Sequence, residues 1–289
     1  MAIPTDYIFT RGTVAKNGVF DLIVNSLIAA GWQSVASLPS ADGTVLKSTG
    51  NNEDKALIIN IRDTNVSNTN SVKATNYNTM SYRLQDTYTP GAAGVAGVFG
   101  RPSLAWTALD IVPTVATTGT LAQDTTLTYS VYADKSKIIL ALEYPSATNY
   151  SPLLFYLGAP DSIWASDSLN TGCLLATTVN ATTTASSFYI CNTSDGMGSV
   201  TAPYMLTTYT QLPPGDPNMG GKRMVSSIYY GNAVEGYRGK LDGVKCLLNT
   251  KINTGDTVTI GSETYYTLLC HAQGNSSFPS GAALLIRTA

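Results

Sequence analysis

Two alternating apolar stretches around a short polar turn constrain this chain most. They lie in TTLTYSVYADKSKIILALEY, residues 125–144, where the turn is Asp134-Lys135-Ser136. The apolar set is Leu127, Tyr129 and Val131 before the turn and Ile138, Leu140 and Leu142 after it. Because every second residue of a strand points to the same face, this pattern predicts an antiparallel hairpin with one apolar face. That face must be covered by another layer of structure.

Two further hairpins are predicted. In GDTVTIGSETYYTLL, residues 255–269, two alternating segments flank Gly261-Ser262, which fits a two-residue type II′ turn. Turn geometry explains these glycines, so a glycine-rich ligand loop is unnecessary. The third hairpin joins residues 44–49 to residues 55–63 through the turn GNNED. In its second strand Leu57, Ile59 and Ile61 share one face.

One helix is predicted near the N-terminus, from an apolar stripe with helical spacing. Asn17 is the expected N-cap, Gly31 the expected C′ residue, and Trp32 is expected to pack back under the helix end. The stripe consists of Phe20, Ile23, Val24, Leu27 and Ile28. Other strands are predicted at 151–158, 172–178, 186–191, 222–231, 242–248 and 283–288. The fold class is therefore α+β, predominantly antiparallel β with an N-terminal amphipathic helix.

The chain divides into three predicted regions. Residues 1–63 form a helix and hairpin layer, and residues 121–289 form a β-rich core domain, which is either separate from 1–63 or continuous with it. Residues 64–120 are rich in Asn, Ser, Thr and Gly, which favour turns and irregular structure. We expect them to form an extended loop or an arm that reaches a neighbouring molecule.

Composition limits the kinds of partner. Charged residues make up 12% of the chain, about half the usual share, and the net charge is −2. This balance excludes electrostatic attraction to nucleic acid, and no apolar run is long enough for a membrane span. We also expect no signal peptide. A neutral surface rich in Thr and Asn is cheap to desolvate, which suits a surface covered by other subunits; a secreted β-rich protein has the same composition.

The sequence predicts no catalytic, cofactor-binding or metal site. His271 is the single histidine, and Cys270 beside it points to the opposite face of a regular strand. No motif joins Glu143 or Glu235 to a second carboxylate, and most aspartates stand in turns. The four cysteines lack zinc-ligand spacing and are either buried thiols or two disulfides.

Tyrosines and glycines are the candidate subunit-interface residues. Tyrosine is abundant, with 17 residues, and its ring with a polar tip suits a half-buried interface. Four glycines recur at every third position in TPGAAGVAGVFGRPS, which fits neither a collagen helix nor a phosphate loop. The candidates are Tyr77, Tyr82, Gly91, Gly94, Gly97, Gly100, Tyr229 and Tyr230.

Several phrases together resemble virion structural proteins of tailed bacteriophages. They are AAGW, STGNNEDKALIINI, SYRLQDTYTPGAAGVAGVFGRPS, YSVYADKSKIILALE, YYGNAVEGYRGKLDGV and GDTVTIGSETYYTLL with FPSGAALLIRT. The resemblance implies a non-enzymatic virion subunit that assembles with its own copies and with other virion proteins, at the tail or baseplate. The alternatives are a neck or collar ring protein, or a β-module on the virion that binds a receptor or a host-surface glycan.

Overall fold

The computed structural model describes fifteen segments of the chain, which together contain every helix and strand named below. The described residues are 6–35, 43–64, 79–85, 87–92, 95–99, 107–111, 121–143, 152–162, 173–177, 186–193, 196–200, 225–232, 236–248, 252–269 and 282–289. All strand pairs among them are antiparallel, and the one α-helix lies near the N-terminus, as the sequence predicts.

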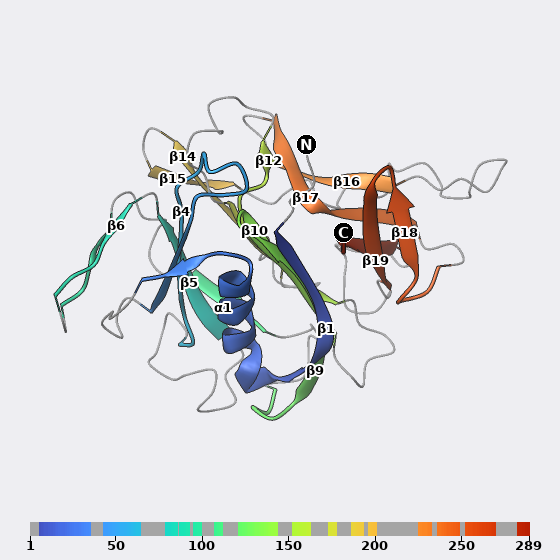
Figure 1. The fold of residues 1–289 in the computed structure, drawn as a ribbon, viewed down its shortest axis with the longest axis horizontal. Coiled ribbons are helices and arrows are strands. Elements are labelled where there is room, and N and C mark those ends of the chain that lie inside the picture. The colour runs from blue at the N-terminus through green and yellow to red at the C-terminus, as the bar shows by residue number, and fades with distance from the viewer. Residues whose placement is uncertain are drawn as a thin grey trace.

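Three larger sheets form the body of the protein (Figure 1). The central sheet has the order β1-β9-β10-β11-β13-β14-β15. The N-terminal sheet has the order β2-β3-β4-β5-β8. The C-terminal sheet has the order β12-β17-β20-β19-β18, with β16 paired to β17. The central sheet lies between the other two, because one of its faces packs on α1 and the N-terminal sheet while the opposite face packs on the C-terminal sheet.

The strands of the central sheet are β1 (Tyr7–Ala15), β9 (Thr126–Asp134), β10 (Lys137–Glu143), β11 (Leu153–Gly158), β13 (Cys173–Thr177), β14 (Ser186–Thr193) and β15 (Gly196–Val200). The N-terminal sheet contains β2 (Gln33–Ser34), β3 (Thr44–Ser48), β4 (Leu57–Arg62), β5 (Thr79–Gln85) and β8 (Thr107–Asp110). The C-terminal sheet contains β12 (Asp161–Ser162), β16 (Val225–Asn232), β17 (Gly236–Leu248), β18 (Thr257–Ile260), β19 (Glu263–Leu269) and β20 (Ala282–Arg287). A separate ribbon consists of β6 (Tyr88–Thr89), β7 (Val98–Phe99) and the described residues between them, 90–92 and 95–97.

The hairpin of β9 and β10 confirms the strongest sequence prediction. Asp134 pairs with Lys137, so Lys135 and Ser136 form the turn. The alternation sorts side chains as predicted: the set from Leu127 to Leu142 faces α1 and the N-terminal sheet. The intervening residues Tyr132, Ile139 and Ala141 face the C-terminal sheet instead. Both faces of this hairpin are therefore buried, which is why its apolar content exceeds that of a half-exposed strand.

The other two predicted hairpins are also present. In β3–β4, Ser48 pairs with Leu57, and the predicted face of β4 packs into the core shared with α1. In β18–β19, Ile260 pairs with Glu263 around Gly261 and Ser262. Gly261 has a φ of +65°, the value that a type II′ turn requires at its first central residue.

The helix confirms part of its prediction. α1 covers Val19–Ala29 and follows a 3-10 turn, η1, at Lys16–Gly18. Asn17 lies inside η1 and is not the N-cap; Gly18 takes that place and has no side chain to cap with. At the other end Gly31 has a φ of +94° and the Trp32 N–H donates to the Leu27 carbonyl, which closes the helix as predicted.

The buried stripe of α1 is narrower than predicted. Val19, Ile23 and Leu27 are fully buried, and they lie one turn apart on a single line of the helix. Ile28, which was expected in the stripe, is 43% exposed. The helix contacts β1, β9, β10 and β3, so it lies against the central sheet at its junction with the N-terminal sheet.

Residues 64–120 are not one extended arm. β5 pairs with β4 and β8 pairs with β5, so both extend the N-terminal sheet. Met80 and Tyr82 of β5 are buried in the core beneath it. The abundance of turn-forming residues conceals these strands, since pairing with the buried β4 outweighs weak local propensity. The part that projects from the body is the β6–β7 ribbon, seen at the left of Figure 1.

β1 is a strand that the sequence patterns do not predict. It pairs with β9 along its whole length, from Tyr7 opposite Asp134 to Ala15 opposite Thr126. Arg11 and Gly12 interrupt its alternation, which hides the strand in the sequence. Tyr7 and Phe9 pack toward the C-terminal sheet, while Ile8 and Val14 pack toward α1. Within the described residues no helix approaches the length of a bilayer span, since α1 has 11 residues.

Gly158 should be among the least replaceable glycines of the central sheet. Its φ is +129°, and a Cβ there would lie 2.2 Å from the carbonyl oxygen of Ser136. Gly261 also has positive φ but has open space around it. We expect Gly261→Ala to cost about 1–2 kcal/mol of unfolding free energy from backbone strain alone, and Gly158→Ala to cost clearly more because steric overlap is added. Urea unfolding of both variants measures this, and equal losses would contradict the packing given for Gly158.

Candidate functional site

The turn between β9 and β10 is the point where the three sheets meet. Asp134 shapes this turn, because its Oδ1 accepts the backbone N–H groups of Ser136 at 2.7 Å and Lys137 at 3.1 Å. An aspartate that bonds the backbone two and three residues ahead stabilises a tight turn without glycine. The Ser136 carbonyl in turn accepts the N–H of Ala159, which follows β11.

One side of this turn bonds to the N-terminal layer. The indole Nε1 of Trp32 donates to the Asp134 carbonyl at 2.9 Å, at a fully buried position. The Asn51 N–H donates to Ser136 Oγ at 2.9 Å, and the Ser48 hydroxyl donates to the Lys135 carbonyl. The β9–β10 turn is thereby fixed to the end of α1 and to the β3–β4 turn.

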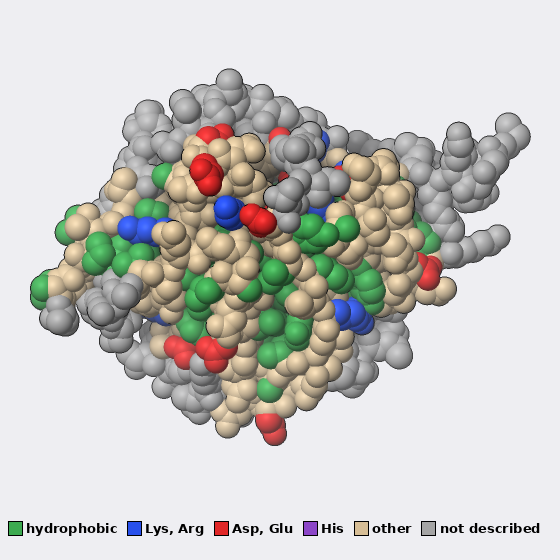
Figure 2. All heavy atoms as spheres, viewed as in Figure 1, with side chains coloured by type: hydrophobic (Ala, Val, Ile, Leu, Met, Phe, Trp, Pro, Cys, Tyr) green, Lys and Arg blue, Asp and Glu red, His purple; other side chains and the backbone are tan. Residues whose placement is uncertain are grey.

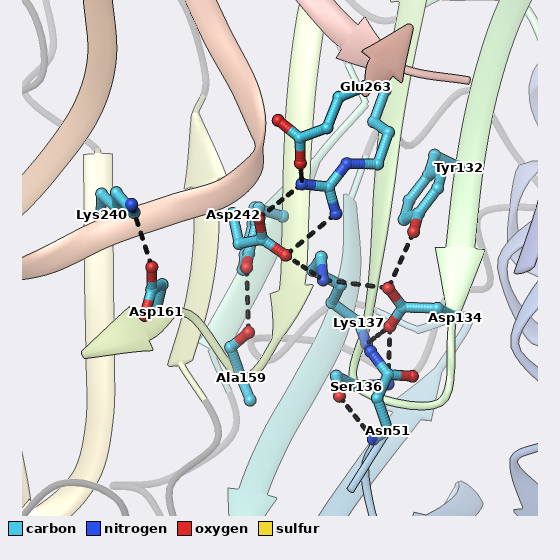
Figure 3. Close-up of polar contacts among 12 residues, drawn as sticks. Asn51, Tyr132, Asp134, Ser136, Lys137, Ala159, Asp161, Lys240, Asp242 and Glu263 are labelled. Carbon is cyan, nitrogen blue, oxygen red and sulfur yellow. Dashed lines mark hydrogen bonds and ion pairs between the residues drawn. The ribbon is translucent and has the colours of Figure 1, made fainter. Parts of the chain in front are cut away.

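The other side reaches the C-terminal sheet through buried charges (Figure 3). Lys137 Nζ lies 2.9 Å from Asp134 Oδ2 and 2.8 Å from Asp242 Oδ2 on β17. Arg287 of β20 holds the same Asp242 with two hydrogen bonds, of 2.8 and 3.2 Å, and also pairs with Glu263 of β19. We call Asp134, Lys137, Asp242, Glu263 and Arg287 the ionic cluster.

Aromatic rings complete the surroundings of the ionic cluster. The Tyr132 hydroxyl donates to Asp134 Oδ2 at 3.0 Å, and both Lys137 and Arg287 lie within 6.0 Å of the Tyr132 ring centre. The Tyr265 hydroxyl donates to Glu263 at 2.6 Å. Each tyrosine hydroxyl thus bonds a carboxylate while its ring packs in the core. The hydrogen bond satisfies both the hydroxyl and the carboxylate that accepts it.

Lys137, Asp242 and Arg287 keep one another ionised. Burial alone would raise the pKa of Asp242, but Lys137 and Arg287 outweigh it and hold that pKa well below its usual range. Burial opposes the charge of Lys137 and Arg287 as well, yet their carboxylate partners raise the pKa of both. Burial, reinforced by the neighbouring carboxylate, raises the pKa of Tyr132 and of Tyr265 far above the ordinary phenol value.

No member with a shifted pKa is therefore suited to exchange protons near neutral pH. General acid–base catalysis works best when a group titrates near the working pH. The pKa values of Lys137, Asp242 and Arg287 are all shifted away from neutral pH. Among the described residues, no group of three or more His, Cys, Asp or Glu side chains is placed to hold a metal ion. The arrangement can do two things: it joins β9–β10 to the C-terminal sheet, and it presents fixed charges at the protein surface.

A polar hollow of about 530 Å³ opens beside the ionic cluster. Its polar lining includes Asp161, Ser227, Lys240, Asp242, Lys245 and Glu263. Ile260 adds apolar surface, and the turn at Gly261 and Ser262 also lines the hollow. Asp242 and Glu263 thus belong both to the hollow and to the buried cluster behind it.

The predicted interface residues that the structure describes do not gather in one place. Tyr82 is 1% exposed and lies in the chain's own core, so its ring offers no surface to a second chain. The backbones of Tyr229 and Tyr230 pair with β17 inside the C-terminal sheet. Gly91 and Gly97 lie in the β6–β7 ribbon, far along the chain from these strands. Tyr77, Gly94 and Gly100 lie outside the described residues.

Of the residues considered for catalysis, Glu143 lies within the part of the chain that the structure describes. Glu143 ends β10 and lies 3.1 Å from Arg11 of β1 in an ion pair. Cys246 is a buried thiol on β17, 3.6 Å from the Ser226 carbonyl. Cys270, His271 and Glu235 lie outside the described residues. The side chains of Cys173 and Cys191 are also outside what the structure describes, although their backbones belong to β13 and β14.

The β6–β7 ribbon is fixed at its base and exposed beyond it. Tyr88 is buried against Val45 and Ile58, on the face of the N-terminal sheet that points away from α1. A Cβ on Gly97 would lie 2.5 Å from the Tyr88 ring, so this glycine is needed where the two strands meet. Val95 and Val98 are 57% and 70% exposed. With Ile28, they are the exposed large hydrophobic residues of the part of the chain that the structure describes.

Sequence reasoning does not find the ionic cluster. Lys137 begins the apolar strand KIILALE, and Arg287 ends the apolar strand AALLIR. A charged residue at the end of an apolar strand usually marks the point where the strand leaves the core. The only sequence signal is that Lys137 and Arg287 each directly adjoin a strongly apolar run. No family model matches the sequence, and no curated protein matches it either.

Removing one charge from the cluster should destabilise the fold strongly. Lys137→Met would leave Asp134 and Asp242 facing each other in a buried site, and we expect a loss of about 3–5 kcal/mol of unfolding free energy. The matched control is Lys240→Met, which breaks a half-exposed ion pair with Asp161 and should cost less than about 1 kcal/mol. Urea denaturation followed by fluorescence compares the two. A loss for Lys137→Met as small as that of the control would show that the cluster does not hold the sheets together.

Proposed function

We propose that this chain is a non-enzymatic structural subunit of a tailed-phage virion, located at the tail or baseplate, where it assembles with copies of itself and with neighbouring tail proteins. The phage assignment rests on the resemblance of its sequence phrases. The observation that carries the assembly role is the β6–β7 ribbon, because it presents Val95 and Val98 to solvent.

The β6–β7 ribbon is suited to a contact with another subunit, because such a contact would stabilise it. A two-stranded ribbon is marginally stable alone and gains stability when it packs on something. Tyr88 supplies that packing at the base, with Lys47 near its ring, but nothing equivalent covers Val95 or Val98 within the described residues. Two exposed valines on one short ribbon suit a contact with an apolar surface of a neighbouring subunit.

Two other features support assembly. β1 is an edge strand of nine residues, and within the described part of the chain it has a strand partner on one side only. Such an edge can pair with a strand of another chain. On the face shown in Figure 2, charged side chains are scattered among neutral ones and form no large patch of one sign. Subunits with such faces can approach without strong repulsion and with little charge to desolvate.

The ribbon proposal is tested by replacing its valines. Val95→Thr with Val98→Thr keeps side-chain shape and strand propensity while removing apolar contact, so we expect the fold to remain and the oligomers to weaken. Native mass spectrometry and negative-stain images of the purified chain, over a range of concentrations, give the oligomeric state of both forms.

Ile28→Thr is the matched control, since it removes an exposed apolar side chain from α1 and not from the ribbon. It should leave the oligomers unchanged. Even weak contacts are populated at about 1 mM. A wild-type chain that stays monomeric up to that concentration would contradict self-assembly. Oligomers that form equally well in the double variant would show that the ribbon is not the contact.

A further inference from the structure

The hollow on the C-terminal sheet has the chemistry of a binding site that is separate from the ribbon. It lies among β12, β16 and β17 and the tip of the β18–β19 hairpin. Its charged lining consists of three acidic side chains, Asp161, Asp242 and Glu263, and two basic ones, Lys240 and Lys245. Small-molecule sites typically have volumes of roughly 300–1,000 Å³, so about 530 Å³ is an ordinary size for one.

Each charge that lines the hollow has a partner of opposite sign. Lys240 lies 3.1 Å from Asp161, and Asp242 is held by Lys137 and Arg287. Glu263 pairs with Arg287 and lies 4.0 Å from Lys245. A cation or an anion would therefore meet as much repulsion as attraction. An apolar ligand would remove water from these charges and return no hydrogen bond, which is unfavourable.

A ligand whose groups both donate and accept hydrogen bonds fits this lining best. A hydroxyl has one donor and two acceptor sites, an ammonium has three donors, and a carboxylate has about four acceptor sites, so an ion pair leaves capacity on both partners. Ile260 provides apolar surface for the C–H groups of such a ligand. We propose that the hollow binds a neutral saccharide of one or two sugar rings.

The ionic cluster behind the hollow makes this site rigid before a ligand arrives. Arg287 and Lys137 fix Asp242 from behind, and Arg287 fixes Glu263, so neither carboxylate has to be ordered on binding. Binding sites gain affinity when their groups are already in place. A buried ion network adds little to stability compared with an apolar core. The ionic cluster would have a second role if it presents fixed acceptors to a ligand.

The saccharide site does not rest on the assembly proposal. Binding can be measured on the purified chain whatever its oligomeric state, and the pocket residues are not those of the ribbon. Failure of one proposal therefore leaves the other standing. A subunit with both features would join neighbouring subunits through β6–β7 and hold a glycan on the C-terminal sheet.

The test uses saturation-transfer-difference NMR with glucose, galactose, mannose, N-acetylglucosamine, lactose and maltose. We expect at least one of them to bind, with an affinity that hardly changes between about 0.05 and 0.5 M salt, because the ligand is neutral. Replacing both Asp161 and Lys240 by Ala removes one acceptor group and one donor group from the lining of the hollow without changing the net charge. Affinity should then fall about tenfold, as expected for the loss of about two hydrogen bonds.

The matched control replaces another surface ion pair, Asp54 and Lys55, by Ala, which also leaves net charge unchanged. This control should bind the sugar as the wild type does. The proposal is overturned if none of the six sugars binds at about 10 mM, a concentration that reveals even weak sites. It is equally overturned if binding persists undiminished in the Asp161→Ala, Lys240→Ala variant, or if the control loses binding to the same extent.

Discussion

The contact between Lys137 and Asp242 is the interaction on which the rest of the structure depends. It joins the turn of the β9–β10 hairpin to the C-terminal sheet at 2.8 Å, while Trp32 and Asn51 bond the same turn to the N-terminal layer. Apolar packing on both faces of the central sheet supplies the bulk of the stability. Apolar packing is not directional, however, and the ionic cluster fixes how the layers are placed relative to one another. The cost of burying these charges is offset by the pairing of Lys137 and Arg287 with carboxylates.

This rigid body carries its candidate functional features at its periphery. The β6–β7 ribbon extends from the outer face of the N-terminal sheet, β1 leaves one edge of the central sheet open within the described residues, and the polar hollow lies on the C-terminal sheet. A stiff core with contact elements on several sides suits a protein that is one part of a larger particle. The shifted pKa values within the ionic cluster all move away from neutrality, so Lys137, Asp242 and Arg287 hold fixed charges near neutral pH.

The sequence predicts what depends on local pattern. The three hairpins follow from alternation and turn residues, and α1 follows from its spacing and from Gly31, because these signals lie within a few residues of each other. β1 and β5 escape prediction because Arg11, Gly12 and the polar surroundings of β5 break the pattern, and pairing with buried strands decides instead.

The candidate site is harder to predict than the fold for the same reason. Lys137 and Asp242 are 105 residues apart in the chain, and nothing in the sequence near either residue indicates the other. Tyr82 is a residue that the sequence places at the surface and the structure places in the core. The polar residues beside it in the sequence suggest a surface tyrosine, but its position on β5 buries it. Residues brought together by sheet stacking become visible only when the layers are known.

The most direct test of this account is residue-level amide hydrogen exchange at the β9–β10 turn. The N–H groups of Ser136, Lys137 and Ala159 are bonded within the junction of the three sheets, whereas Gly261 and Ser262 form an ordinary exposed hairpin turn. If the junction holds the layers together, its amides should exchange only when the whole protein unfolds, as slowly as those of the central strands. Exchange at the β9–β10 turn as fast as at Gly261 and Ser262 would contradict the account, because the junction would then open without disturbing the fold.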